Sequence, residues 1–274
     1  MVWCMTIAES GLDALAPVDG LLVDLSDGVL SVTIDRPESL NSLTPRVLDG
    51  LADAFECAAT DPRVRVVRLG GTGRGFSSGA GIGAAETGDG HEPVETLLQA
   101  NRASKAIVNL PRPVVAVVQG PTAGVGVSLA LACDLVIASE KAFFLLAFTK
   151  IGLMPDGGAS ALVAASIGRA RAMKMALLAE RLSAADAHAA GLISAVHPAE
   201  DLEAEATKVI VRLLAGPAVA YAKTKQAING ATLPDFDAAL ARETAGQHIL
   251  LNSADLREGI RAFQEKRDPT FTDS

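Results

Sequence analysis

Two glycine-rich stretches are the part of this sequence best suited to chemistry that uses the backbone. The first runs from residue 70 to residue 90, and the second from Gly120 to Gly126. Clustered glycines let a backbone approach a ligand closely and direct N–H groups at it. Two such N–H groups can form an oxyanion hole, which stabilises negative charge on a carbonyl oxygen. From the pattern alone, an oxyanion hole and two ordinary loops are equally supported interpretations.

Two side-chain motifs overlap the first stretch. Gly75–Gly79 matches G-x-S-x-G, which would make Ser77 a nucleophile, but that motif needs a strand directly before it and a helix directly after it. The preceding strand is expected to end near Leu69. Gly79–Ala84 matches the dinucleotide pattern G-x-G-x-x-A, which needs a long following helix that Gly88-Asp-Gly90 would stop. Neither motif is in the context that it requires.

Alternating strands and helices are expected to position these stretches. Leu21–Leu25 and Val29–Asp35 flank a turn sequence and predict a hairpin. Thr44 followed by Pro45 predicts the N-cap of a helix that runs to about residue 60. Apolar periodicity predicts further strands at 64–69, 113–118 and 135–139, and helices at 93–110, 124–133, 157–167 and 169–179.

The last part of the chain has a different pattern. Ser183 and Asp186 resemble a capping box that opens another helix, and beyond residue 200 the pattern is helical throughout. We therefore expect the α/β class, with a loose leader at 1–17, a core at 18–200 and a helical region at 201–274. An oligomer contact is one use for the apolar residues of that last region.

Composition excludes several classes of protein. The 274 residues carry a net charge of −8, which opposes a nucleic-acid surface across the fold. Three scattered cysteines and four distant histidines predict no metal site. Pro113–Cys133 is uncharged over 21 residues, but prolines and glycines interrupt it, so we expect a buried strand and helix rather than a membrane span. With no signal peptide in the sequence, we expect a cytoplasmic protein.

Short segments along the chain resemble the crotonase (enoyl-CoA hydratase/isomerase) superfamily. They occur in the family's order and span nearly all of the sequence. They are Thr33-Ile-Asp-Arg-Pro-Glu-Ser-Leu-Asn-Ser-Leu43, Gly73-Arg-Gly-Phe-Ser-Ser-Gly-Ala-Gly-Ile82, Pro113-Val-Val-Ala-Val-Val-Gln-Gly120, Ala130-Leu-Ala-Cys-Asp-Leu-Val-Ile-Ala-Ser139, Ile151-Gly-Leu-Met-Pro-Asp-Gly-Gly158, Ala190-Gly-Leu-Ile193 and Arg257-Glu-Gly-Ile-Arg-Ala-Phe-Gln-Glu-Lys-Arg267.

The resemblance implies a spiral of ββα units, a C-terminal helical trimerisation region, and a trimer or a dimer of trimers. It implies acyl-CoA substrates, with coenzyme A as part of the substrate and no separate cofactor. By position, the backbone N–H groups of Ala80 and Val125 would form the oxyanion hole. The positions that would bind substrate or CoA are Ser78, Gly81, Ile82, Gly83, Gly124, Phe148, Phe263 and Lys266, the last two reaching CoA from a neighbouring subunit.

The sequence departs from the hydratase pattern of this family. Ser128 and Phe148 stand at the positions of the two hydratase glutamates, and Gly81 replaces the usual aspartate of the first loop. Asp156 matches the acid/base of some family isomerases, and Ala147–Asp156 looks especially like the ring-epoxide isomerases of phenylacetate breakdown. The resemblance therefore favours double-bond isomerisation. The alternatives are an atypical enoyl-CoA hydratase of fatty-acid β-oxidation, a non-catalytic acyl-CoA-binding protein, and a hydrolase that uses Ser77.

Several of these side chains have structural interpretations as well. Asp156 precedes a glycine and a helical segment, so it is also a candidate helix N-cap, and both roles can hold at once. Asp134 is interpreted as structural, and Asn41 as a residue that fixes its loop. Arg36 could touch CoA or fix the same loop. Lys266, taken alone, is typical of a solvated surface lysine.

Overall fold

A six-stranded sheet forms the centre of the fold in the computed structural model, which describes residues 11–81 and 93–273. The strand order is β1-β2-β4-β6-β8-β11, with β1 and β2 antiparallel and all other neighbours parallel. These strands are β1 (Leu21–Ser26), β2 (Val29–Ile34), β4 (Val66–Gly71), β6 (Val114–Val118), β8 (Leu135–Ser139) and β11 (Ala195–His197).

Two small sheets lie beside it, one of β3 and β5 and the other in the order β10-β9-β7. Their strands are β3 (Ser42–Leu43), β5 (Gly79–Ala80), β7 (Pro121–Ala123), β9 (Phe143–Leu145) and β10 (Leu182–Ser183). The helices of the described residues are α1 (Pro45–Thr60), α3 (Pro93–Asn109), α4 (Val125–Ala132), α5 (Ala159–Leu178), α6 (Ala184–Ala190), α7 (Leu202–Leu214), α8 (Ala218–Thr232), α9 (Phe236–Leu250) and α10 (Ala254–Glu265). The predicted α/β class with helices at the C-terminal end is confirmed.

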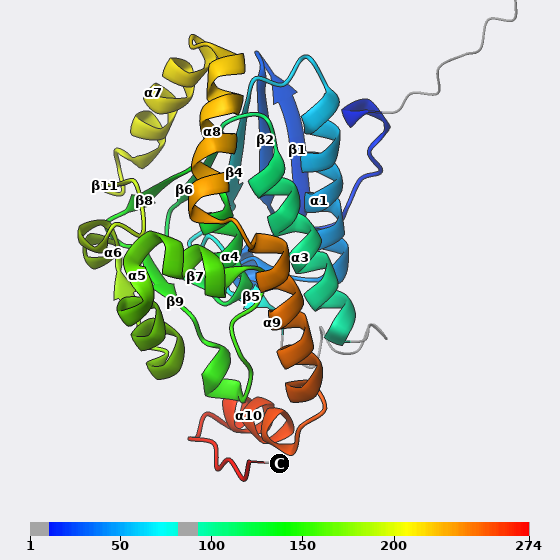
Figure 1. The fold of residues 1–274 in the computed structure, drawn as a ribbon, viewed down its shortest axis with the longest axis vertical. Helices are drawn as coiled ribbons and strands as arrows, with labels where there is room; N and C mark the ends of the chain where they lie inside the picture. The colour runs from blue at the N-terminus through cyan, green and yellow to red at the C-terminus, as the bar shows by residue number, and fades with distance from the viewer. Residues whose placement is uncertain (1–10, 82–92, 274) are drawn as a thin grey trace, which may run out of the picture.

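Both faces of the main sheet are covered. Figure 1 shows α1 and α3 on one side of it and α7 on the other. Successive residues of β6 point to opposite faces, so Val114, Ala116 and Val118 join one buried cluster, and Val115 and Val117 join another. A strand buried on both faces reads as a continuous apolar run, which explains the uncharged segment at 113–118. None of the described helices is long and apolar enough to cross a membrane.

Local signals in the sequence act as predicted. The hairpin turns at Asp27 and Gly28, which both have positive φ. The Thr44 hydroxyl accepts a hydrogen bond from the Val47 N–H at the start of α1, and the Ser183 hydroxyl does the same for Asp186 at the start of α6. The break predicted between two helices falls inside α5, where Gly168 leaves helical geometry.

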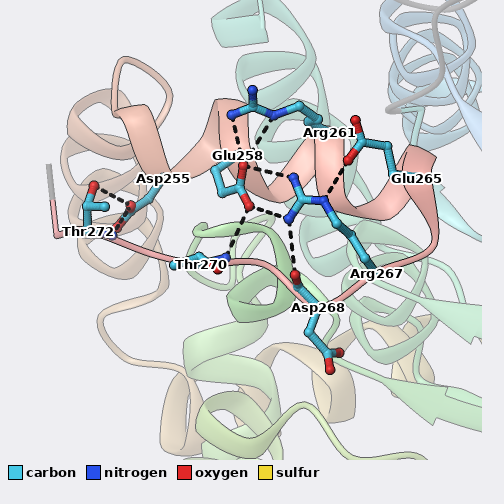
Figure 2. A network of polar contacts seen from close by, with 8 residues as sticks. All are labelled: Asp255, Glu258, Arg261, Glu265, Arg267, Asp268, Thr270 and Thr272. Atoms are coloured by element: carbon cyan, nitrogen blue, oxygen red, sulfur yellow. Dashed lines mark hydrogen bonds and ion pairs between the residues drawn. The ribbon is translucent and has the colours of Figure 1, made fainter.

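The C-terminal helices return to the region of the short strands. α9 packs against α3 and α5, and α10 packs against the 3-10 turn Phe148–Ile151. Figure 2 shows how the chain after α10 folds back along that helix. The Arg267 guanidinium donates to Glu258 at 2.6 Å, and the Thr270 and Thr272 N–H groups donate to Glu258 and Asp255. These contacts fix the end of the chain against α10.

Candidate active site

The two glycine-rich stretches come together at the start of α4. The Phe76 N–H donates to the Pro121 carbonyl at 3.0 Å, and the Ala123 N–H donates to the Ser77 carbonyl at 2.9 Å. Gly79 has a φ of +88°, and a Cβ there would lie 2.8 Å from the Ala123 oxygen. Only glycine fits so close an approach at positive φ. The pairing therefore sets β5 beside the N-terminus of α4.

The candidate oxyanion donors lie on these two adjacent elements. The Gly81 N–H donates across to the Leu43 carbonyl of β3 at 3.2 Å. Because successive N–H groups of a strand point to opposite edges, the Ala80 N–H faces away from β3. Val125 is the first residue of α4 after the Gly124 N-cap, so its N–H belongs to the first turn, whose donors have no partner within the helix. The arrangement suits an anion at a helix N-terminus.

The other residues predicted in these stretches have mixed outcomes. Ser78 is half-buried, and its hydroxyl donates to the Ser39 carbonyl at 2.9 Å. Gly81 and Gly124 are half-buried beside the candidate amides. Ile82 and Gly83 lie outside the described residues, so their predicted contacts with substrate stay predictions.

Ser77 has a structural role in the turn. Its hydroxyl is fully buried, donates to the Asn41 carbonyl at 2.8 Å and accepts from the Gly79 N–H at 3.2 Å. It follows β4 only after an intervening loop, and the segment after it forms β5 rather than a helix. The strand–turn–helix context of a nucleophile elbow is therefore missing here.

The loop after β2 is held by the two polar residues noted in the sequence. Asn41 is fully buried, and its amide donates to the Thr72 and Gly75 carbonyls at 2.9 and 2.8 Å. Its side-chain oxygen accepts from the Arg36 N–H, and the Arg36 guanidinium donates to the Ser42 carbonyl. The loop-fixing interpretation of Asn41 is confirmed, and Arg36 acts on the same loop.

Asp156 is buried in the loop before α5. Its side-chain Oδ2 accepts a hydrogen bond of 2.6 Å from the Gln247 amide, and its Oδ1 has no partner among the described residues. Burial raises the pKa of the Asp156 carboxyl to about 7, because a low-dielectric surrounding disfavours the charged form. The hydrogen bond from Gln247 lowers this pKa, and the negative charge of Glu243 raises it. A carboxyl with a pKa near neutrality is suited to general acid/base chemistry.

The prediction that Asp156 caps the following helix is wrong. α5 begins at Ala159 with Gly158 as N-cap and without a capping bond from a local side chain. Glu243 of α9 supplies the acceptors instead, at 2.7 Å from the Gly158 nitrogen and 2.8 Å from the Ser160 nitrogen. The Asp156 side chain therefore does not cap α5.

Ser128 links the Asp156 loop to α4. Its side chain is fully buried, and its hydroxyl donates to the Asp156 carbonyl at 2.7 Å. Ser128 follows Val125 by three residues, so the two lie on one face of α4 about one turn apart. Asp156 and the candidate oxyanion donor are consequently held by the same short helix.

Phe148 begins the 3-10 turn and is buried in the main core cluster. A Cβ on Gly124 would lie 3.9 Å from its ring. The phenyl group therefore fills space beside the N-terminus of α4.

Asp134, at the end of α4, is structural as predicted. Its carboxylate accepts from the Lys225 ammonium at 3.0 Å and from the Val114 N–H at 2.8 Å. A cavity of about 480 Å³ lies beside this pair, and its lining includes residues of α4, α5 and α8. Asp156 does not line it, so this cavity is separate from the candidate site.

Phe263 and Lys266 lie exposed at the C-terminal end of α10, and Lys266 is the C-cap of that helix. Their predicted contact with CoA across a subunit boundary stays a prediction. Among the described residues, no His, Cys, Asp or Glu side chains gather into a group that could hold a metal ion.

Sequence reasoning missed Glu243 and Gln247. They stand 83 or more residues from the groups that they bond. Their one signal in the sequence is a polar pair spaced four residues apart on the face of α9 that also carries Leu240.

The fold and site define an α/β protein with two candidate backbone donors and a buried carboxyl at Asp156, and comparison with known proteins gives its family. The enoyl-CoA hydratase/isomerase family matches residues 24–274. A probable enoyl-CoA hydratase from Rhodobacter capsulatus is 43% identical over 256 residues, which cover 91% of this chain and 96% of the relative. The 1,2-epoxyphenylacetyl-CoA isomerase of Escherichia coli is 38% identical over 257 residues, covering 92% and 98%.

A solved structure agrees with these relatives. The crystal structure of an enoyl-CoA hydratase from Mycobacterium avium subsp. paratuberculosis has a TM-score of 0.89 and 66% identity, and the match covers 94% of this chain and 100% of that one. The chain therefore belongs to the enoyl-CoA hydratase/isomerase family, as the sequence motifs predicted.

Proposed function

We propose that this protein isomerises the double bond of an unsaturated acyl-CoA thioester, with Asp156 as the acid/base. The observation that carries the proposal is the buried carboxyl of Asp156, whose pKa burial raises to about 7. Its loop is held by the Ser128 hydroxyl, which donates to the Asp156 backbone carbonyl one turn of α4 from the candidate amide of Val125. A carboxyl with a pKa near neutrality is present in both its protonated and its ionised form at neutral pH, so it can both take up and return a proton.

The chemistry balances with one carboxyl. Hydrogen bonds from the Ala80 and Val125 N–H groups to the thioester oxygen would acidify the proton at C2. Asp156 takes that proton, the electron pair moves into a dienolate, and the two amides stabilise its negative oxygen. The same carboxylic acid then delivers the proton to C4, which leaves the double bond between C2 and C3. The proton shift needs no redox partner, so coenzyme A, as part of the substrate, is the one nucleotide that we propose it uses.

The surroundings of Asp156 favour a proton shift over the addition of water. Hydration needs a water molecule that is activated and placed against the double bond. The two positions that match the hydratase glutamates hold a hydroxyl bonded to the Asp156 carbonyl and a buried phenyl ring. Neither Ser128 nor Phe148 can act as a second carboxylate.

Hydration is the second candidate, because the Rhodobacter capsulatus relative and the 66%-identical solved structure both carry the name hydratase. The Escherichia coli relative, at 38% identity, is named as an isomerase. Substrate tests on purified protein separate the two reactions.

The test offers 3-enoyl-CoA and 2-enoyl-CoA esters to the wild type, to Asp156→Asn and to Asp156→Glu. We expect isomerisation by the wild type, a loss of about a hundredfold or more in Asp156→Asn, and partial activity in Asp156→Glu. Isomerisation that survives in Asp156→Asn would remove Asp156 from the mechanism. Robust hydration by the wild type would defeat the isomerase assignment, and binding of all esters without turnover would indicate a non-catalytic binding protein. A Ser77→Ala variant that loses thioesterase activity would support a hydrolase instead.

We also propose that the protein assembles as a trimer or a dimer of trimers in the cytoplasm. Large apolar side chains are exposed on the C-terminal helices, among them Val219 at 77% and Ile249 at 73%. Such residues favour burial against another subunit. Light scattering coupled to gel filtration measures the mass, and a monomer at micromolar concentration would contradict this proposal.

A further inference from the structure

The face of α9 that meets the Asp156 loop carries two buried polar side chains. Glu243 and Gln247 are each 1% exposed, and Phe236, Ala239 and Leu240 anchor the same helix in the core. Burying a polar or charged side chain costs free energy unless hydrogen bonds compensate. The hydrogen-bond partners of these two residues therefore indicate their role beside the Asp156 loop.

Glu243 holds the backbone of the loop. Its two carboxylate oxygens accept the N–H groups of Gly158 and Ser160, at 2.7 and 2.8 Å. Gly157 and Gly158 have φ values of +64° and +88°, in the left-handed region that favours glycine. Two adjacent glycines are conformationally free, so the loop needs external contacts to keep one shape, and Glu243 supplies them.

Gln247 holds the carboxyl itself. Its side-chain oxygen accepts the Met154 N–H at 3.3 Å, which leaves its amide nitrogen as the donor to Asp156 Oδ2 at 2.6 Å. The bond can persist in both protonation states, because Oδ2 accepts a hydrogen bond whether or not Oδ1 carries a proton. Oδ1 is buried and has no partner among the described residues, so it is the oxygen left to bond a substrate.

We propose that Gln247 and Glu243 are positioning residues for the acid/base: Gln247 holds Oδ2 so that Oδ1 exchanges the proton, and Glu243 fixes the loop that carries the carboxyl. The inference rests on the proposed function of Asp156.

The two residues act on Asp156 with opposite electrostatic sign. The Gln247 N–H stabilises the ionised carboxylate and lowers its pKa, whereas the negative charge of Glu243 raises that pKa. Other elements around the loop present neutral groups, Ser128 from α4 and Ser104 from α3. Lys150 of the 3-10 turn and His248 of α9 are exposed. Glu243 is thus the charged residue that faces Asp156 within the part of the chain that the structure describes.

The test compares the pH dependence of kcat/KM for isomerisation of a 3-enoyl-CoA, which reports the pKa of the free enzyme. Activity should rise with pH as Asp156 ionises. Gln247→Met removes the donor at similar volume. The rise of kcat/KM with pH, here called the acidic limb, should therefore move to higher pH in this variant. Glu243→Gln removes the negative charge, so its limb should move to lower pH. We expect each shift to be about half a pH unit or more, with kcat reduced.

Two further variants serve as controls. His248→Gln changes the exposed neighbour of Gln247 on the same helix, and its limb should stay where it is in the wild type. Glu243→Asp keeps the charge but shortens the side chain, so it should lower kcat without moving the limb downward. Limbs that stay in place in both Gln247→Met and Glu243→Gln, or that move in the same direction, would overturn the proposal.

A second readout separates this inference from the proposed function. Infrared titration of the carboxyl band, with Asp156→Asn as the subtracted reference, measures the Asp156 pKa in any folded variant, active or not. Opposite shifts of this band in Gln247→Met and Glu243→Gln are expected. If Asp156→Asn kept full isomerase activity while the shifts occurred, the proposed function would fail and the positioning would stand. If Asp156→Asn were inactive and the band did not move, the positioning would fail alone.

Discussion

The buried Asp156 carboxyl should make the free energy of unfolding depend on pH. The pKa of Asp156 rises from 3.8 to about 7 in the folded protein, so the native state binds its proton more tightly than the unfolded chain does. The stability that the native state gains from this tighter proton binding is fully present below pH 3.8 and is lost as the pH rises through 7. At about 1.4 kcal/mol per pKa unit, ionising the buried group costs roughly 4 kcal/mol of stability at alkaline pH.

Asp156→Asn removes this titration while keeping the size of the side chain. The variant should therefore gain stability relative to the wild type as the pH rises, by about 3 kcal/mol between pH 5 and pH 8. In a domain of this size, that corresponds to a relative rise in Tm of roughly 5–10 °C. The same variant should lose isomerisation, so the predicted acid/base would be a group that the fold keeps at a cost in stability.

The measurement is guanidinium unfolding of both proteins at several pH values and one protein concentration, so that assembly affects both alike. Glu243, whose pKa burial also raises, is present in both proteins, and its own titration largely cancels in the difference. Asp24→Asn, at an exposed position of β1, is the matched control and should show no growing advantage with pH. An Asp156→Asn advantage that stayed constant within about 0.5 kcal/mol from pH 5 to pH 8 would refute the reasoning.

Two further predictions concern ligand binding. Gly79→Ala places a Cβ 2.8 Å from the Ala123 oxygen at positive φ, so it should displace the Ala80 N–H and lower kcat about a hundredfold, roughly the loss of one oxyanion donor. Steady-state kinetics would measure this, and an unchanged kcat in a folded variant would argue against the assigned donor. Lys266→Ala should raise KM for the CoA ester several-fold with little change in kcat, more at low salt than at high salt, if the ammonium meets a phosphate. A KM equal to that of the wild type at low salt would remove Lys266 from the CoA site.

Local sequence signals predicted the framework well, because short-range physics decides those features. The Thr44 and Ser183 caps, the hairpin turn and the break at Gly168 each depend on a few neighbouring residues. The doubly buried β6 likewise follows from an apolar run without charges. The short strands β5, β7 and β9 were not predicted, because two or three residues carry no periodicity.

The site was predicted only where motif and geometry coincide. The glycine-rich stretches indicated a close backbone approach, and the structure brings them together at Gly79 and Ala123. The N-cap interpretation of Asp156 was wrong because a residue far along the chain competes for the same N–H groups. A local rule cannot anticipate that Glu243 occupies the helix end, since that contact depends on how α9 packs.

The position of α9 late in the chain has a consequence for biosynthesis. Gln247, which bonds Asp156, is made 91 residues after it. A chain that ends before α9 could still pair its strands and bring the glycine-rich turns together. Its Asp156 would lack the bond from Gln247, and without the cover of α9 burial would raise the pKa of its carboxyl less than in the complete fold. The full rise in the pKa of Asp156 would thus require the last quarter of the polypeptide to be folded. Partial or truncated chains would therefore lack the proposed acid/base activity.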